Sequence, residues 1–128
     1  MDIVTRKQLN ILIQLAEADK HFSSIEREMI FEIARKRNFS EDSVRDLIKN
    51  PEPIESFGAL SDDQKFEYLF SCIDLMLLDK RIFESEIKFC RNVAIKLGFN
   101  KSVVDFLQNE IYKHQKEDLK RMIFNEYT

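Results

Sequence analysis

Four carboxylates recur in two copies of one short pattern, and they are the most concentrated signal for chemistry in the chain. Asp19 and Glu26 are repeated sixty positions later as Asp79 and Glu86. Carboxylate oxygens between two helices can coordinate a hard divalent cation such as calcium or magnesium. They can also accept hydrogen bonds from the backbone. Each Asp would then accept from N–H groups of the turn, and each Glu would cap the next helix from its N3 position. We favour the capping interpretation and keep the cation site as the alternative.

Other catalytic and ligand-binding patterns are missing from the sequence. His21 and His114 are far apart, and no His-x-x-x-His or Cys-x-x-Cys spacing occurs, which argues against zinc. There is no glycine-rich phosphate loop and no Ser, Cys or Thr in a nucleophile motif. A short helical chain of this kind is expected to be a binding module rather than an enzyme.

Two other functions stay open as alternatives. One is an accessory enzyme whose acidic site is formed by the same four carboxylates. The other is weak nucleic-acid binding through the basic run 35–37, which would contact phosphates. That run is explained more simply as a partner for the negative end of a helix dipole, so nucleic acid is not the expected partner.

The composition indicates one helical domain without a membrane segment. The chain has 128 residues, 44% of them hydrophobic, with two glycines and two prolines, which suits a helical core better than a sheet. No apolar run reaches the length of a membrane span, and the N-terminus lacks the features of a signal peptide. We therefore expect no membrane insertion and a cytoplasmic location. Cys72 and Cys90 fall on apolar helical faces and are expected to be reduced core residues.

Helical periodicity and capping residues divide the chain into six helices and a tail. Asn38 and Gly98 fit left-handed caps at helix C-termini. The stretch 50–60 contains both prolines and is predicted to be a linker. The tail, about 112–126, is predicted to be a seventh helix or a continuation of the sixth. The predicted N-caps are Ser23, Ser40, Ser61 and Asn100, with Glu26 and Gln64 completing capping boxes.

The two halves of the sequence repeat each other in helical phase. Between residues 5–50 and the segment sixty positions later, eleven positions are identical, among them Leu9/Leu69 and Phe39/Phe99. The repeat predicts two three-helix units, about 5–50 and 61–111, that bury their apolar faces on each other. The expected fold is an all-α bundle with pseudo-two-fold symmetry plus a C-terminal helix, in one domain over residues 1–128.

The repeated segments resemble the TerB family, which is named for a tellurite-resistance protein. The similarity lies in segments 15–20 and 76–80, each followed by a Glu, and in the turn 96–99, Lys-Leu-Gly-Phe. It implies an all-α fold of two helical halves and a role in bacterial stress response. It also implies a divalent-metal site at Asp19, Glu26, Asp79 and Glu86. The chain departs from the family pattern where Lys20 and Lys80 replace a Gly and where Phe83 replaces a polar cap.

Aromatic and tail residues bear on partners. Among eleven phenylalanines, Phe31, Phe57 and Phe83 fall off the main apolar stripes and are candidates for an exposed partner surface. The alternative is that the linker and tail cover them. The apolar tail residues need a surface in this chain or in a second copy. We therefore expect a non-enzymatic interaction module that binds a protein partner or forms a homodimer.

Overall fold

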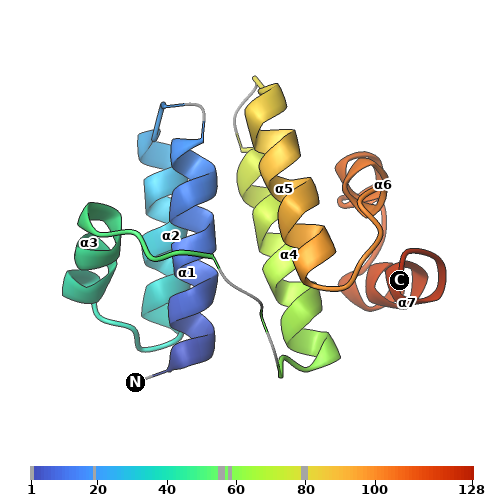
Figure 1. The fold of residues 1–128 in the computed structure, drawn as a ribbon, viewed down its shortest axis with the longest axis horizontal. Helices are drawn as coiled ribbons and strands as arrows, with labels where there is room; N and C mark the ends of the chain where they lie inside the picture. Colours follow the sequence, from blue (N-terminus) through green and yellow to red (C-terminus); the bar gives the residue numbers. More distant parts are fainter. Residues whose placement is uncertain (1, 19, 55–56, 58, 79–80) are drawn as a thin grey trace.

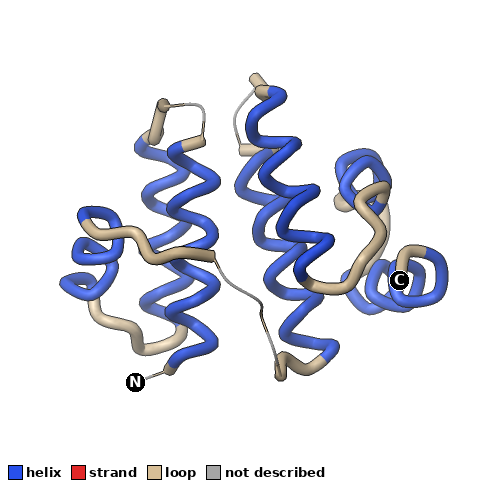
Figure 2. Tube along the Cα trace, viewed as in Figure 1, coloured by secondary structure: helices blue, strands red, loops and turns tan. Residues whose placement is uncertain are grey.

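The computed structural model describes residues 2–18, 20–54, 57, 59–78 and 81–128, and all regular structure in these residues is helical (Figure 2). This confirms the predicted all-α class. The helices are α1 (Ile3–Glu17), α2 (Ser24–Lys36), α3 (Glu41–Lys49), α4 (Asp62–Met76), α5 (Glu84–Lys96), α6 (Val103–Glu110) and α7 (Lys116–Glu126).

The helices form two hairpins that lie side by side (Figure 1). α1 and α2 make the first hairpin, α4 and α5 make the second, and α1 packs against α4 at the centre. α3 covers the first hairpin by packing on α1 and α2, while α6 packs on α5 and α4. α7 lies below α6 at the outer end of the second half (Figure 1).

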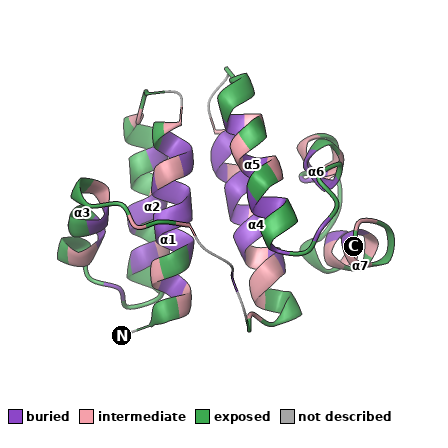
Figure 3. Cartoon of the chain, viewed as in Figure 1, coloured by how far each residue is buried: buried purple, intermediate pink, exposed green. Residues whose placement is uncertain are grey.

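The two central helices are buried around most of their circumference. In α1 the run from Gln8 to Ile13 is entirely buried, and α4 is buried at Phe66, Tyr68 and most positions from there to Met76. Figure 3 shows the buried residues gathered along the facing sides of the hairpins. The sequence pattern predicted a single apolar stripe on each helix, but both helices have neighbours on several sides, so polar residues such as Gln8 are also buried.

The predicted serine N-caps are confirmed. The hydroxyls of Ser23, Ser40 and Ser61 each accept a hydrogen bond from the backbone N–H three residues later, at 3.1–3.3 Å. The side chains of Glu26 and Gln64 accept hydrogen bonds in return from the backbone N–H of Ser23 and Ser61. These local bonds satisfy N–H groups that the first turn of a helix leaves without intrahelical partners.

Equivalent left-handed turns end α2 and α5. Asn38 has φ +57° and Gly98 has φ +91°, which confirms both predicted caps. After them, the N–H of Phe39 donates to the Ala34 C=O. The N–H of Phe99 likewise donates to the Ala94 C=O, and each bond is 2.9 Å long. This is the Schellman arrangement, and it turns the buried rings of Phe39 and Phe99 back onto the core.

The predicted start of the sixth helix was wrong by two residues. Asn100 does not cap α6, because the helix begins at Val103 with Ser102 as its N-cap. The Asn100 side chain instead accepts hydrogen bonds from the Ser102 N–H at 3.0 Å and hydroxyl at 2.9 Å. An Asn side chain that bonds two residues ahead stabilises a turn, and here that turn precedes the helix.

The tail is a separate helix that docks on its own chain. α7 begins at Lys116 rather than near 112, and Leu119 and Ile123 are completely buried. The ring of Phe124 packs on Phe99 at 5.2 Å between centroids. The apolar tail residues therefore find their surface in this chain.

The linker lies along α1 and covers one of the predicted exposed aromatics. Both backbone groups of Glu52 are bound by the Asn10 side chain, at 2.9 Å each. Phe57 is buried and meets Tyr68 edge to face at 5.8 Å. Phe31 is also buried, so of the three candidates only Phe83 is exposed, at 37%.

The cysteines behave as the sequence predicts. Cys72 and Cys90 are free and fully buried. Burial raises the pKa of the Cys72 thiol to about 12 and that of Cys90 well above its ordinary value, so neither is a nucleophile at neutral pH. Among the described residues, no helix is long and apolar enough to cross a bilayer.

Candidate functional site

Two of the four acidic residues singled out in the sequence, Glu26 and Glu86, lie just after the turns within the two hairpins. Figure 1 places both turns at the same end of the molecule. Glu26 and Glu86 are 1% exposed at the starts of α2 and α5. Glu26 Oε1 accepts hydrogen bonds from the Ser23 N–H at 3.1 Å and hydroxyl at 2.8 Å. Glu86 Oε1 accepts one from the Phe83 N–H at 3.0 Å.

These contacts confirm Glu26 as a capping-box residue and show the reciprocal half of that arrangement at Glu86. Phe83 has no side-chain acceptor, so only the Glu-to-backbone bond forms there. Asp19 and Asp79, the other two predicted cation ligands, lie outside the described residues. Within the described ranges, no three His, Cys, Asp or Glu side chains are grouped so that they could hold a metal ion.

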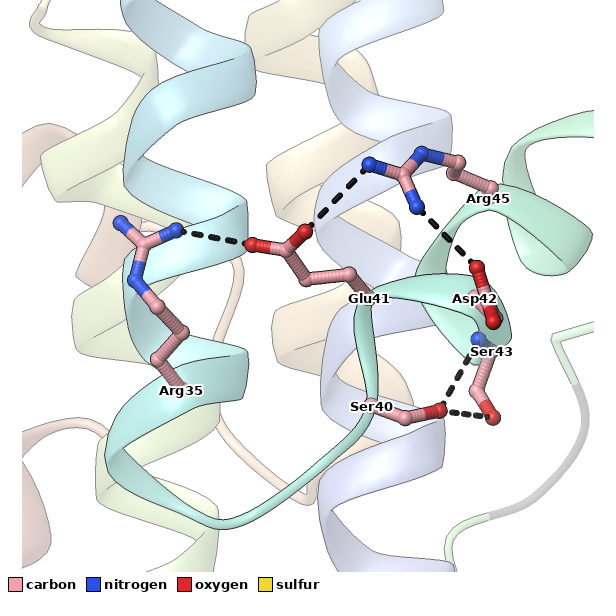
Figure 4. A network of polar contacts seen from close by, with 6 residues as sticks. All are labelled: Arg35, Ser40, Glu41, Asp42, Ser43 and Arg45. Carbon is pink, nitrogen blue, oxygen red and sulfur yellow. Dashed lines mark hydrogen bonds and ion pairs between the residues drawn. The ribbon is translucent and has the colours of Figure 1, made fainter.

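The basic run at the end of α2 is mostly engaged in ion pairs. Arg35 pairs with Glu41 at 3.4 Å, and Figure 4 shows that this carboxylate also meets Arg45. Lys36 pairs with Glu32 at 3.6 Å along α2. The Arg37 side chain is exposed and forms no hydrogen bond or ion pair with another described residue. Of the three basic side chains in the run 35–37, only that of Arg37 lacks an ion-pair partner among the described residues.

A cleft of about 360 Å³ opens between α2 and α4, and we call it the α2–α4 cleft. Its floor is Gln8 of α1 and Ser71 of α4, and its apolar walls are Met29, Ile33 and Phe70. Its size is at the lower end of the range for small-molecule sites in proteins. The charged rim consists of Glu32, Lys36, Arg37, Glu67, Asp74 and Lys116.

The floor of the cleft contains a buried oxygen without a partner. Gln8 is 3% exposed, and its Nε2 donates to Ser71 Oγ at 3.1 Å. Ser71 Oγ in turn donates its proton to the Tyr68 C=O at 2.9 Å, so it can only accept from Gln8. This fixes the orientation of the Gln8 amide and leaves its Oε1 with no hydrogen-bond donor among the described residues. Such a buried carbonyl destabilises a fold by about 1–3 kcal/mol.

The rim of the cleft is balanced in charge and partly paired. Lys116 lies 3.6 Å from a Glu67 carboxylate oxygen and 4.4 Å from the centre of the Phe70 ring. Asp74 accepts a hydrogen bond of 2.7 Å from the Tyr112 hydroxyl. Three cations face three carboxylates, and Arg37 is the cation without a partner among the described residues.

A second hollow of about 290 Å³ lies under the linker, but its polar groups bind each other. Asn10 bonds the backbone of Glu52, and Arg6 pairs with the Glu52 carboxylate at 2.9 Å. The two halves do not pack in the same way on both sides. α1 packs on α5, whereas the equivalent helices α4 and α2 make no comparable contact in the part of the chain that the structure describes, and the α2–α4 cleft lies between them. The α2–α4 cleft is therefore the better candidate, because its polar groups still have bonding capacity.

Sequence reasoning missed Gln8 and Ser71. The available signal was a polar residue beside the predicted apolar stripe of each of two helices. Nothing local indicated that these residues, sixty-three positions apart, would meet. Comparisons with protein-family models, with curated proteins and with solved structures each find no match to this chain. What the cleft can bind therefore follows from its own chemistry.

Proposed function

We propose that the chain is a non-enzymatic binding module and that the α2–α4 cleft is its ligand site. The observation that carries this proposal is the buried Oε1 of Gln8, which has no donor among the described residues although it belongs to a side chain that lines an open cleft. Natural folds leave few buried polar groups without partners, and those that persist call for an explanation. Binding of a donor from a ligand would supply one.

The TerB-like arrangement of two halves is part of this proposal. Several pairs sixty positions apart share local geometry, including the left-handed Asn38 and Gly98. A second example is a contact between equivalent positions of the two halves. Gln14 donates to the Glu52 C=O, and sixty positions later Asp74 accepts from the Tyr112 hydroxyl. Lys20 has φ +63°, a left-handed conformation that suits the Gly of the family pattern. These features support the arrangement in two similar halves, and the role in bacterial stress response is proposed from the sequence resemblance alone.

A divalent-metal site at the acidic turns would add a second role to such a module. Glu26 and Glu86 accept backbone N–H groups through Oε1, and the proposed metal site would take its ligands from the carboxylates of Asp19, Glu26, Asp79 and Glu86. Calcium or magnesium remains the cation that this donor set would prefer. The cleft is the stronger basis for a function, because its geometry lies wholly within described residues.

The cleft proposal predicts where small molecules bind. In ¹H–¹⁵N correlation spectra of the full chain, a fragment library should shift the amides of Phe70 and Ser71 and the side-chain NH₂ of Gln8. Replacing Ile33 in the cleft wall with Trp should abolish these shifts, because the indole fills the space between the walls.

The matched control is Ile95→Trp, since Ile95 is 54% exposed on α5 and does not line the cleft. It should leave the shifts unchanged. Fragments that shift only the residues under the linker, such as Lys7 and Ile54, would contradict the proposal.

A further inference from the structure

We infer that the α2–α4 cleft takes a small carboxylate that also carries an N–H or O–H donor and an apolar group, as an α-amino acid or a peptide C-terminus does. This inference rests on the proposed function and names the ligand class for the same site. Three features of the cleft carry it: the exposed guanidinium of Arg37, the carbonyl of Gln8 and the apolar walls.

The charge of the rim selects the anion. Lys36 and Lys116 already face Glu32 and Glu67, so Arg37 is the cation that can accept an anionic ligand. A guanidinium binds a carboxylate through two parallel N–H···O bonds. A phosphate dianion would bring a second negative charge toward Glu32, Glu67 and Asp74 on the same rim. The rim therefore favours a single carboxylate over phosphate.

Gln8 provides the second point of recognition next to the first. Gln8, Arg37 and Glu67 line both the α2–α4 cleft and an adjoining hollow of about 210 Å³ that reaches Tyr68. The cation and the carbonyl therefore lie where the two hollows meet. A ligand whose carboxylate binds Arg37 can direct an N–H or O–H a few bonds away at Gln8 Oε1, which lacks a donor among the described residues.

The carbonyl oxygen is covered in the present conformation, so binding requires rearrangement of side chains. Met29, Lys36 and Arg37 line the cleft and have several rotatable bonds each, and Met29 is only partly buried. Their rotation can admit a donor while the helices stay in place. The apolar part of the ligand would then contact Ile33 and Phe70, which are also partly exposed.

The test is a titration of the full chain, followed by the side-chain NH₂ signal of Gln8 and the amide of Ser71. N-acetyl-L-leucine has the carboxylate, the donor and the apolar group. N-acetyl-L-leucinamide replaces the carboxylate with a neutral carboxamide, and 4-methylpentanoate lacks the acetamido group that carries the donor. We expect N-acetyl-L-leucine to bind at least tenfold more tightly than either analogue, and inorganic phosphate to leave the Gln8 signal in place.

Variants assign the charge to one residue. Arg37→Gln should lower the affinity for N-acetyl-L-leucine to that for N-acetyl-L-leucinamide. Arg35→Gln should change the affinity for N-acetyl-L-leucine less than twofold, because Arg35 faces Glu41 and does not line the cleft. Comparing L-leucine with N-acetyl-alanyl-leucine then distinguishes a free amino acid from a chain terminus as the source of the same carboxylate.

The ligand class fails if the amide binds as tightly as the acid, if phosphate binds more tightly, or if Arg37→Gln has no effect. In that case, fragments of other chemistry that still shift cleft residues would leave the binding-module proposal intact. If no fragment of any class shifts the cleft, the proposed function itself fails.

Discussion

Replacing Leu69 with alanine is expected to lower the free energy of unfolding by about 3 kcal/mol. Leu69 is completely buried in α4, one of the two central helices, so the truncation removes apolar contacts and leaves a cavity that surrounding side chains fill only in part. Leu9 is equally buried at the position sixty residues earlier in α1, and Leu9→Ala should have a similar effect. Urea denaturation followed by circular dichroism measures both.

An exposed aliphatic residue provides the control for these core substitutions. Ile95→Ala removes methyl groups from a side chain that is 54% exposed, and it should change the stability by less than about 0.5 kcal/mol. A loss at Leu69 or Leu9 no larger than the loss at Ile95 would contradict the central placement of α1 and α4.

Asn10→Leu is expected to destabilise the protein by about 2–3 kcal/mol through the linker. The Asn10 amide donates to the Glu52 C=O and accepts from the Glu52 N–H, and it is 4% exposed. A leucine there removes both bonds and leaves the Glu52 N–H without its acceptor next to an apolar side chain. Gln14 still donates to the Glu52 C=O at 2.6 Å, which limits the loss.

Hydrogen exchange shows whether this loss comes from the linker. In Asn10→Leu the Glu52 amide should exchange much faster than in the native chain, because its hydrogen bond is gone. The control is Asn125→Leu on an exposed position of α7, which should alter neither the exchange nor the stability. Continued protection of the Glu52 amide in Asn10→Leu would show that the linker is held by other contacts.

The parts of the fold that depend on neighbouring residues could be predicted from the sequence. Ser23 with Glu26 and Ser61 with Gln64 cap their helices within one turn, and that pattern is visible in the residue order. Asn38 and Gly98 are likewise explained by the left-handed turn that ends a helix. The start of α6 was misplaced because Asn100 is a good cap by type but bonds Ser102 in a turn instead.

The cleft could not be predicted in the same way. The contact between Gln8 and Ser71 depends on how α1 packs on α4, which no local pattern specifies. The acidic turns attracted attention because their residues repeat, yet at Glu26 and Glu86 the structure shows backbone capping. The two residues of the cleft floor do not repeat: Gln8 corresponds to Tyr68 sixty positions later, and Ser71 corresponds to Ile11. A search guided by the repeat therefore passes over them.

The central claim is that the Gln8 carbonyl is kept for a ligand although it destabilises the fold, and the unfolding free energy of Gln8→Met tests it most directly. Methionine has a similar length without a polar group, and Ser71 can still donate to the Tyr68 C=O. We predict that the variant is about 1 kcal/mol more stable than the native chain in urea denaturation. A variant less stable by a similar amount would show that Gln8 serves the fold through Ser71, and would contradict the claim.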